Sequence, residues 1–170
     1  IAAASGMPVP TMYQYIDGKE DLLFLIYESF MGDINARVRA SVSSELSPTE
    51  NLKRAIRANM ECNDEYHRYI KLMFQETRAL SPEGRERVDR LDGDHVGIWR
   101  AILKDGIAAG EFDVDGVELM ANYIFYLCGV WALRYWSIGG HGFEAVSDSI
   151  SRFVLCAVVA PGAEPDTKAA

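Results

Sequence analysis

Residues 22–42 read LLFLIYESFMGDINARVRASV, and their pattern decides the fold class. Apolar side chains recur there every three or four residues, at Leu22, Leu23, Ile26, Phe30, Ile34 and Val38. This period places them on one face of an α-helix. The segments 52–74, 88–107 and 143–158 repeat the pattern, and none alternates apolar and polar residues as a strand does. The sequence therefore predicts an all-α protein.

Short polar residues mark where several of these helices begin. Asp17, Ser47 and Asp115 are each followed three residues later by a glutamate, which is the spacing of a capping box. Ser81 precedes Pro82, and proline suits the first helical position because the N–H that it lacks is unpaired there anyway. We expect helices to begin at these points, a possible break near residue 93, and two final helices over about 115–138 and 143–160.

The composition argues against a membrane span and against a metal site. The most apolar run, residues 119–133, is shorter than the ~20 residues that a spanning helix needs, and we interpret it as a buried helix. Cys62, Cys128 and Cys156 lie far apart without the spacing of zinc ligands. We therefore expect free thiols in a reducing cytoplasm, with no metal and no cofactor.

The charge is unevenly distributed along the 170 residues. The formal net charge is -8, which is unfavourable for a protein that contacts DNA phosphates. However, residues 1–16 carry no acidic side chain, and most carboxylates fall between Asp64 and Glu118. A neutral tip on an acidic body is compatible with DNA binding by a small module. It argues against a protein that coats nucleic acid.

Residues 1–23, IAAASGMPVPTMYQYIDGKEDLL, predict two short helices around a tight turn. The first ends at Gly6, which lacks a Cβ and suits a left-handed turn. The second runs from Pro8 to about Ile16, and this arrangement is the helix-turn-helix pattern. Hydroxyl and amide groups on the second helix can reach phosphates or base edges, at Thr11, Tyr13, Gln14 and Tyr15. Because the chain opens in the middle of a helix, we expect further residues upstream.

These residues resemble the helix-turn-helix signature of the TetR (tetracycline-repressor-like) family, roughly A-x-x-A-G-V-S-x-G-T-L-Y-x-Y-F-x-S-K-E-x-L. The matching positions are Ala3, Ala4, Ser5, Gly6, Pro10, Thr11, Met12, Tyr13, Tyr15, Ile16, Lys19, Glu20, Leu22 and Leu23. The resemblance implies a ligand-responsive transcriptional repressor that binds double-stranded operator DNA as a homodimer. It implies a partial DNA-binding module over 1–20, whose first helix is missing here, and a helical-bundle regulatory domain over 21–160. We expect the tail, 161–170, to be disordered.

The resemblance also assigns roles near the DNA. The implied DNA-binding residues are Val9, Pro10, Thr11, Tyr13, Gln14, Tyr15 and Lys19. Alternatively, Tyr13 is a packing residue and Lys19 a solvated lysine at a helix start. Val9 stands where the family often has a polar or basic residue, and the helix carries no Lys or Arg. Base readout therefore rests on few contacts.

Segment 69–112 more weakly resembles family members that control fatty-acid or steroid breakdown. This implies a small apolar effector with an acidic or CoA-type head. Aromatic residues concentrate within 119–136, which is typical either of a core or of a ligand pocket. Arg78 or Arg134 can pair with an anionic group or form ordinary ion pairs. We expect the apolar part of the effector to lie against Phe74, Trp99, Leu103, Tyr123, Leu127 and Trp131.

The last two helices are expected to form the homodimer interface. Leu155 and Val159 lie off the main apolar stripe of the final helix, so this helix is apolar on more than one face. Two other function classes compete with the repressor. One is a helical enzyme that uses carboxylates such as Glu61, Glu65 and Glu76, and the other is an adaptor without DNA binding. The signature over residues 3–23 favours the repressor over both.

Overall fold

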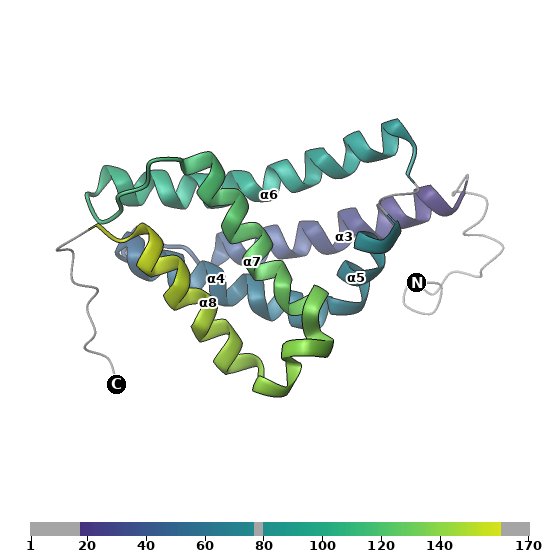
Figure 1. Ribbon diagram of the computed structural model, residues 1–170. Helices are drawn as coiled ribbons and strands as arrows, with labels where there is room; N and C mark the ends of the chain where they lie inside the picture. Colours follow the sequence, from purple (N-terminus) through teal and green to yellow (C-terminus); the bar gives the residue numbers. More distant parts are fainter. Residues whose placement is uncertain (1–17, 77–79, 161–170) are drawn as a thin grey trace.

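The computed structural model describes residues 18–76 and 80–160, which form a bundle of α-helices (Figure 1). These residues contain no strand and only an isolated β-bridge between Phe112 and Val159. The predicted all-α fold is confirmed. The helices, labelled as in Figure 1, are α3 (Lys19–Ala40), α4 (Pro48–Glu65), α5 (His67–Glu76), α6 (Pro82–Ala108), α7 (Val117–Ile138) and α8 (Phe143–Val158), with a short 3-10 helix at Gly139–His141.

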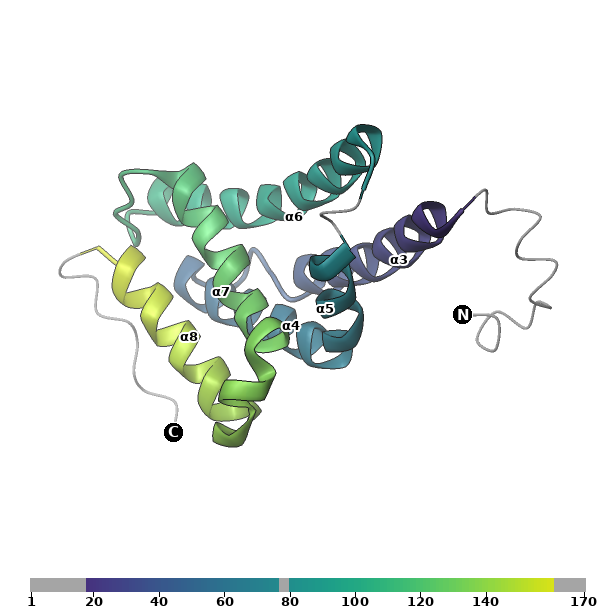
Figure 2. The same ribbon diagram turned by 45° about the vertical axis from the view of Figure 1, so that its right-hand side comes forward.

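Helices α4, α6 and α7 pack against one another in the middle of the bundle, and α3 packs against α4 and α6. The short α5 contacts α3, α4 and α7, whereas α8 contacts α4 and α7. Figures 1 and 2 both place the beginning of α3 and the helix α8 at opposite ends of the molecule. No helix in the described part of the chain is long and apolar enough to cross a membrane.

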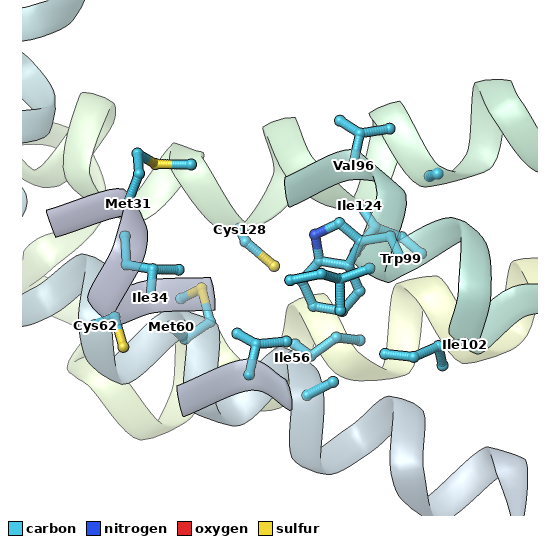
Figure 3. Close-up of a cluster of buried hydrophobic side chains, with 14 of the residues drawn as sticks. Met31, Ile34, Ile56, Met60, Cys62, Val96, Trp99, Ile102, Ile124 and Cys128 are labelled. Atoms are coloured by element: carbon cyan, nitrogen blue, oxygen red, sulfur yellow. The ribbon is translucent and has the colours of Figure 1, made fainter. Parts of the chain in front are cut away.

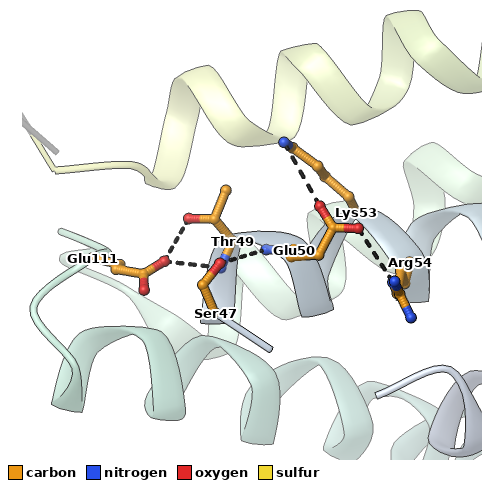
Figure 4. Close-up of polar contacts among 6 residues, drawn as sticks. All are labelled: Ser47, Thr49, Glu50, Lys53, Arg54 and Glu111. Carbon is orange, nitrogen blue, oxygen red and sulfur yellow. Dashed lines mark hydrogen bonds and ion pairs between the residues drawn. The ribbon is translucent and has the colours of Figure 1, made fainter. Parts of the chain in front are cut away.

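Helix α4 begins as its sequence predicts. The Ser47 hydroxyl accepts a hydrogen bond from the Glu50 N–H at 3.2 Å. A carboxylate from another element completes this end, because Glu111 accepts from both the N–H and the hydroxyl of Thr49, at 3.0 and 2.7 Å (Figure 4). The Glu50 side chain does not return to Ser47 and instead pairs with Arg54 at 3.2 Å.

Other helix boundaries differ from the expected ones. Capping of α7 by Asp115 is wrong, since Gly116 occupies the N-cap without a side-chain hydrogen bond. Glu118 pairs with Arg100 at 2.6 Å instead of reaching back along its own helix. The segment 52–74 divides at Tyr66 into α4 and α5, and α6 runs unbroken through residue 93. The final two helices follow the expected ranges closely, while capping by Asp17 falls outside the described residues.

The interior of one half of the bundle surrounds Trp99, which is fully buried. Trp99 extends from α6 beside Ile124 of α7 and toward Ile56 of α4 (Figure 3). Burial of these side chains supplies most of the driving force for folding, at about 25 cal/mol for each Å² of apolar surface removed from water. We call this region the packed half, and its fully buried members include Leu52, Ile56, Trp99, Leu103 and Ile124.

The packed half is closed where α6 ends. Gly110 adopts a left-handed conformation with φ of 76°, directly after the last turn of the helix. The chain then turns so that Phe112 packs against Gly106, where a Cβ would overlap the phenyl ring. The N–H of Asp113 donates to the carbonyl of Val158 at 2.8 Å, which joins this turn to the end of α8. The glycines at 106 and 110 therefore mark a helix end.

Candidate ligand-binding site

A cavity of about 450 Å³ lies among α3, α4, α5, α6 and α7. Its volume falls within the ~300–1,000 Å³ typical of small-molecule sites. We call this region the hollow half of the bundle. One face of α3 lines it at the spacing i, i+3, i+4 and i+7, through Tyr27, Phe30, Met31 and Ile34. The other apolar or aromatic lining residues are Ile70, Met73 and Phe74 of α5, Val88 of α6, and Phe125, Tyr126, Gly129 and Leu133 of α7.

Polar side chains from α4 and α6 interrupt this apolar wall, at Asn59, Asn63, Asp89, Asp92 and His95. The Tyr27 hydroxyl donates a hydrogen bond to Asp92. Burial raises the pKa of Tyr27, and the Asp92 carboxylate raises it further, so the hydroxyl keeps its proton. Burial also raises the pKa of Asp92, whereas the bond from Tyr27 opposes that shift. The cavity therefore contains a partly desolvated carboxyl group.

His95 is buried and bonded through both ring nitrogens. Trp99 Nε1–H can only donate and lies 3.1 Å from His95 Nε2, so Nε2 is the acceptor. Nδ1 consequently carries the proton and donates to Asn35 Oδ1 at 2.6 Å. Asn59 Nδ2 lies 3.2 Å from Nε2 and provides a second donor there. Burial lowers the pKa of His95 to about 4, so the ring is neutral at neutral pH.

Glu20 joins the first turn of α3 to the beginning of α6. Its Oε1 accepts from the Ser81 N–H at 2.9 Å and from the Ser81 hydroxyl at 2.7 Å. The same hydroxyl accepts from the Gly84 N–H at 3.0 Å, which caps α6 as predicted. A Cβ at residue 84 would overlap Glu20 Oε1, so a larger residue there would displace the Glu20 carboxylate from Ser81. Further along α6, Val88 and Asp92 line the cavity. We call the Glu20–Ser81 contact the α3–α6 link.

The structure distributes the apolar residues expected to bind the effector over both halves. Phe74 lines the cavity. Trp99 lies directly behind the cavity-lining His95, and Leu103 is fully buried in the packed half. Leu127 is half-buried against the core, and Trp131 is buried. Phe74 is thus the one member of the expected set that touches the cavity among the described residues.

The remaining expected residues lie elsewhere. Tyr123 is exposed on α7, and the Arg134 guanidinium lies 4.7 Å from the ring centre of Trp136. Arg134 also has a non-helical backbone conformation, which kinks α7. Arg78 is outside the described residues. The same holds for Val9, Pro10, Thr11, Tyr13, Gln14 and Tyr15, whereas Lys19 is the first residue of α3.

Sequence reasoning missed the polar wall of the cavity. Asn59 and Asn63 stand four residues apart on the face of α4 that also carries buried apolar side chains. A pair of amides on an apolar face is a usable signal, because buried polar groups require partners. Asp89 stands among alternating charged residues in the sequence, and it lines the cavity together with the exposed Phe74.

The carboxylates that would serve a helical enzyme do not line this cavity. Glu61 pairs with Arg57 at 2.8 Å, and Glu65 pairs with Arg37 at 2.8 Å, both at the surface. Glu76 lies at the end of α5. The three groups are therefore not gathered around the space where a substrate could bind.

A second apolar feature lies on the outside of the molecule. Leu119, Tyr123 and Tyr126 are spaced along one stripe of α7 and are 61, 55 and 62% exposed. Phe153 of α8 is similarly exposed. Large exposed apolar groups on helices that pack against each other, as α7 and α8 do, are characteristic of protein interfaces. We call these four residues the α7–α8 face.

Comparison with known proteins identifies the family. A family model described as the tetracyclin repressor-like, C-terminal domain matches residues 45–158. The chain belongs to the TetR family. The HTH-type transcriptional repressor KstR2 of Rhodococcus jostii is 26% identical over 168 residues, which is 97% of this chain and 80% of the relative.

Solved structures show the same TetR-family fold. A regulatory protein of the tetR family from Rhodococcus RHA1 has a TM-score of 0.81 and 19% identity over 94% of this chain and 84% of its own. FadR from Bacillus subtilis, solved in complex with stearoyl-CoA, has a TM-score of 0.73 and 22% identity over 91% of this chain and 84% of its own. The predicted family is confirmed, and its members are transcriptional regulators.

Proposed function

We propose that this TetR-family protein is a cytoplasmic repressor that leaves its operator when an apolar effector fills the cavity. One observation carries the proposal: α6 both lines the cavity and is bonded, through Ser81, to Glu20 in the first turn of α3. A ligand that displaces α6 must therefore act on the beginning of α3. The name of the relative KstR2, a transcriptional repressor, supports the direction of control.

The DNA-binding part of the proposal concerns residues 1–20. We assign operator contacts to Val9, Pro10, Thr11, Tyr13, Gln14, Tyr15 and Lys19. Lys19 begins α3, one residue before Glu20. A movement of the α3–α6 link would therefore also move the adjacent Lys19, which is a proposed phosphate contact. In this proposal, residues 21–160 act as the regulatory domain.

The effector that we propose is an acyl-CoA whose acyl part occupies the cavity, as the complex of FadR with stearoyl-CoA suggests. The described lining is largely apolar, which suits an acyl group. The anionic head would lie outside, near the exposed Arg68 and Lys71 of α5 and Arg134 of α7. The stacked rings of His67 and Tyr135, 5.5 Å apart, bring these two helices together.

We further propose that the α7–α8 face pairs with its copy in a two-fold homodimer. Two-fold symmetry presents two recognition helices to half-sites ~34–36 Å apart, or a multiple of that. A Tyr123→Glu change would place a charge in the centre of this interface, and we expect it to halve the mass in solution. A monomeric wild-type protein at micromolar concentration would contradict the dimer.

The experiment that tests the repressor proposal measures operator binding by the intact protein on the DNA upstream of its own gene. Stearoyl-CoA or lauroyl-CoA should lower operator affinity by roughly 5- to 150-fold, the range of an allosteric coupling of about 1–3 kcal/mol. Gly129→Leu should bind the operator but respond less, because its side chain occupies part of the cavity. Failure of both acyl-CoAs to release the wild-type protein would refute the effector class.

A matched control exists on the neighbouring helix. Gly93 of α6 and Gly129 of α7 are both helical, and a Cβ at either position meets no atom within 4 Å. Only Gly129 lines the cavity. Gly93→Leu should therefore keep the wild-type response, and an equal loss of response in both variants would place the effector elsewhere.

A further inference from the structure

The described charged residues that line the cavity are all acidic. Asp89 and Asp92 line it, whereas none of its described lining residues is Lys or Arg. These carboxylates lie on α6, and α5 contributes only Ile70, Met73 and Phe74 to the lining. A ligand in the cavity therefore meets apolar side chains from α5 and polar groups from α3, α4 and α6, and these polar groups form the polar wall.

Three groups of the polar wall have committed all their hydrogen atoms to protein partners. The single hydroxyl hydrogen of Tyr27 goes to Asp92, and the single ring hydrogen of His95 goes to Asn35. Asn63 Nδ2 uses both of its hydrogens, on Asn59 Oδ1 at 3.3 Å and on the Cys128 carbonyl at 2.9 Å. These three groups have no hydrogen left to offer a ligand.

The acceptor capacity of the same wall is not used up. One carboxylate oxygen of Asp92 accepts from Tyr27, and no other described group donates to Asp92. Asp89 has no ion pair or hydrogen bond to any described residue. A carboxylate that has lost part of its water gains most from a new donor, and hydrogen bonds to charged groups are stronger than neutral ones.

From this excess of acceptors we propose that the effector carries a hydroxyl group on the apolar part that enters the cavity, donated to Asp92. The inference deepens the proposed function and rests on it. An anionic end is disfavoured because like charges repel and no described cation lines the wall. A hydroxyl also loses less hydration on entering a largely apolar cavity than an ammonium group does.

The test compares three CoA thioesters of one chain length by calorimetric titration of the intact protein. The probes are ω-hydroxylauroyl-CoA, lauroyl-CoA and ω-carboxylauroyl-CoA. We expect the hydroxylated thioester to bind about tenfold more tightly than lauroyl-CoA, since ~1.4 kcal/mol corresponds to a factor of ten. The ω-carboxyl thioester should bind most weakly of the three.

A matched pair of variants tests the role of Asp92. Asp92→Asn removes the charge with little change of shape and should reduce the preference for the hydroxyl to less than about threefold. Asp94→Asn makes the same change at an exposed position of α6 that does not line the cavity, and should keep the wild-type preference. The ranking of the three ligands on wild-type protein stands even if Asp92→Asn does not fold.

The possible outcomes separate this inference from the proposed function. Equal binding of the three thioesters, or tightest binding of the carboxyl form, overturns the hydroxyl inference and leaves an acyl-CoA effector intact. Binding of none of them overturns the acyl-CoA effector itself and the hydroxyl inference with it. An unchanged preference in Asp92→Asn would show that Asp92 is not the acceptor.

Discussion

The packed half and the hollow half of this bundle share helices α4, α6 and α7, yet they contain different side chains. Around Trp99 and Leu103 the space is filled by fully buried apolar groups. Around Tyr27 and Met31, where α3 and α5 join the shared helices, about 450 Å³ is open, with Asn, Asp and His side chains in the wall. The comparison teaches that one bundle can separate stability from binding along its length, because close packing is needed for the first and empty volume for the second.

The largest expected effect distinguishes the halves directly. Leu103→Ala should lower the free energy of unfolding by about 2–5 kcal/mol, since it opens a void among fully buried apolar side chains. Phe74→Ala should lower it by less than about 1 kcal/mol, because this side chain is 60% exposed. Urea denaturation measures both values, and calorimetry with lauroyl-CoA should show the opposite ranking. Equal destabilisation would mean that the halves do not differ as described.

The second expected effect is a pH dependence from the buried imidazole between the halves. The folded-state pKa of His95 is about 4, below the value of about 6.5 for an unfolded chain. Between these values the unfolded chain binds more protons, so acidification from pH 6.5 to 4 should remove up to about 3 kcal/mol of stability. Above pH 6.5, His95 contributes no slope.

The His95→Gln variant provides the reference for that measurement. The pKa of Asp92 is raised in the folded protein, so the folded state takes up a proton there before the unfolded chain does. Acidification therefore adds stability through Asp92, while it removes stability through His95. The difference between wild type and His95→Gln across pH cancels the Asp92 contribution. If urea denaturation gives parallel pH profiles for the two proteins, His95 is not the titrating group.

The third effect tests whether the α3–α6 link transmits ligand binding. Glu20 and Glu111 each bridge to a helix beginning by two hydrogen bonds, at Ser81 and Thr49 respectively. Glu20→Gln and Glu111→Gln should each cost about 1 kcal/mol in thermal or urea unfolding. Only Glu20→Gln should weaken operator release by acyl-CoA, because Glu111 is remote from the cavity. Equal loss of release would show a general softening of the bundle.

The smallest effect is a gain in stability. Gly129→Ala and Gly93→Ala should each raise the free energy of unfolding by about 0.5–1 kcal/mol, since alanine favours the helix and its methyl group meets open space at both positions. Gly129→Ala should in addition weaken lauroyl-CoA binding, because its methyl group enters the cavity. A loss of stability at Gly129 would indicate that this part of the wall is more tightly packed than the cavity implies.

Local features of the fold were predictable from the sequence, whereas the site was not. The caps at Ser47 and Ser81 were correct because a side chain there bonds to a backbone group only three residues away. Capping at Asp115 failed because α7 begins one residue later, with Gly116 at the N-cap. Glu118 binds Arg100, 18 residues away, and no local pattern reveals that partner. The aromatic residues expected in the pocket lie on helices that do line it. Only Phe74 reaches the cavity, however, whereas Trp99 is part of the packed half and Tyr123 is exposed.

The sequence by itself determined the all-α fold, most of the helix positions and the family, since helical periodicity, caps and the signature over residues 3–23 are local properties of the chain. Only the tertiary structure decided which residues surround the cavity. Tyr27 and Asp92 are 65 residues apart, and His95 and Asn59 are 36 apart. Such contacts depend on how α3, α4 and α6 pack side by side, and a polar residue becomes part of a binding wall only when another helix brings its partner within hydrogen-bonding distance.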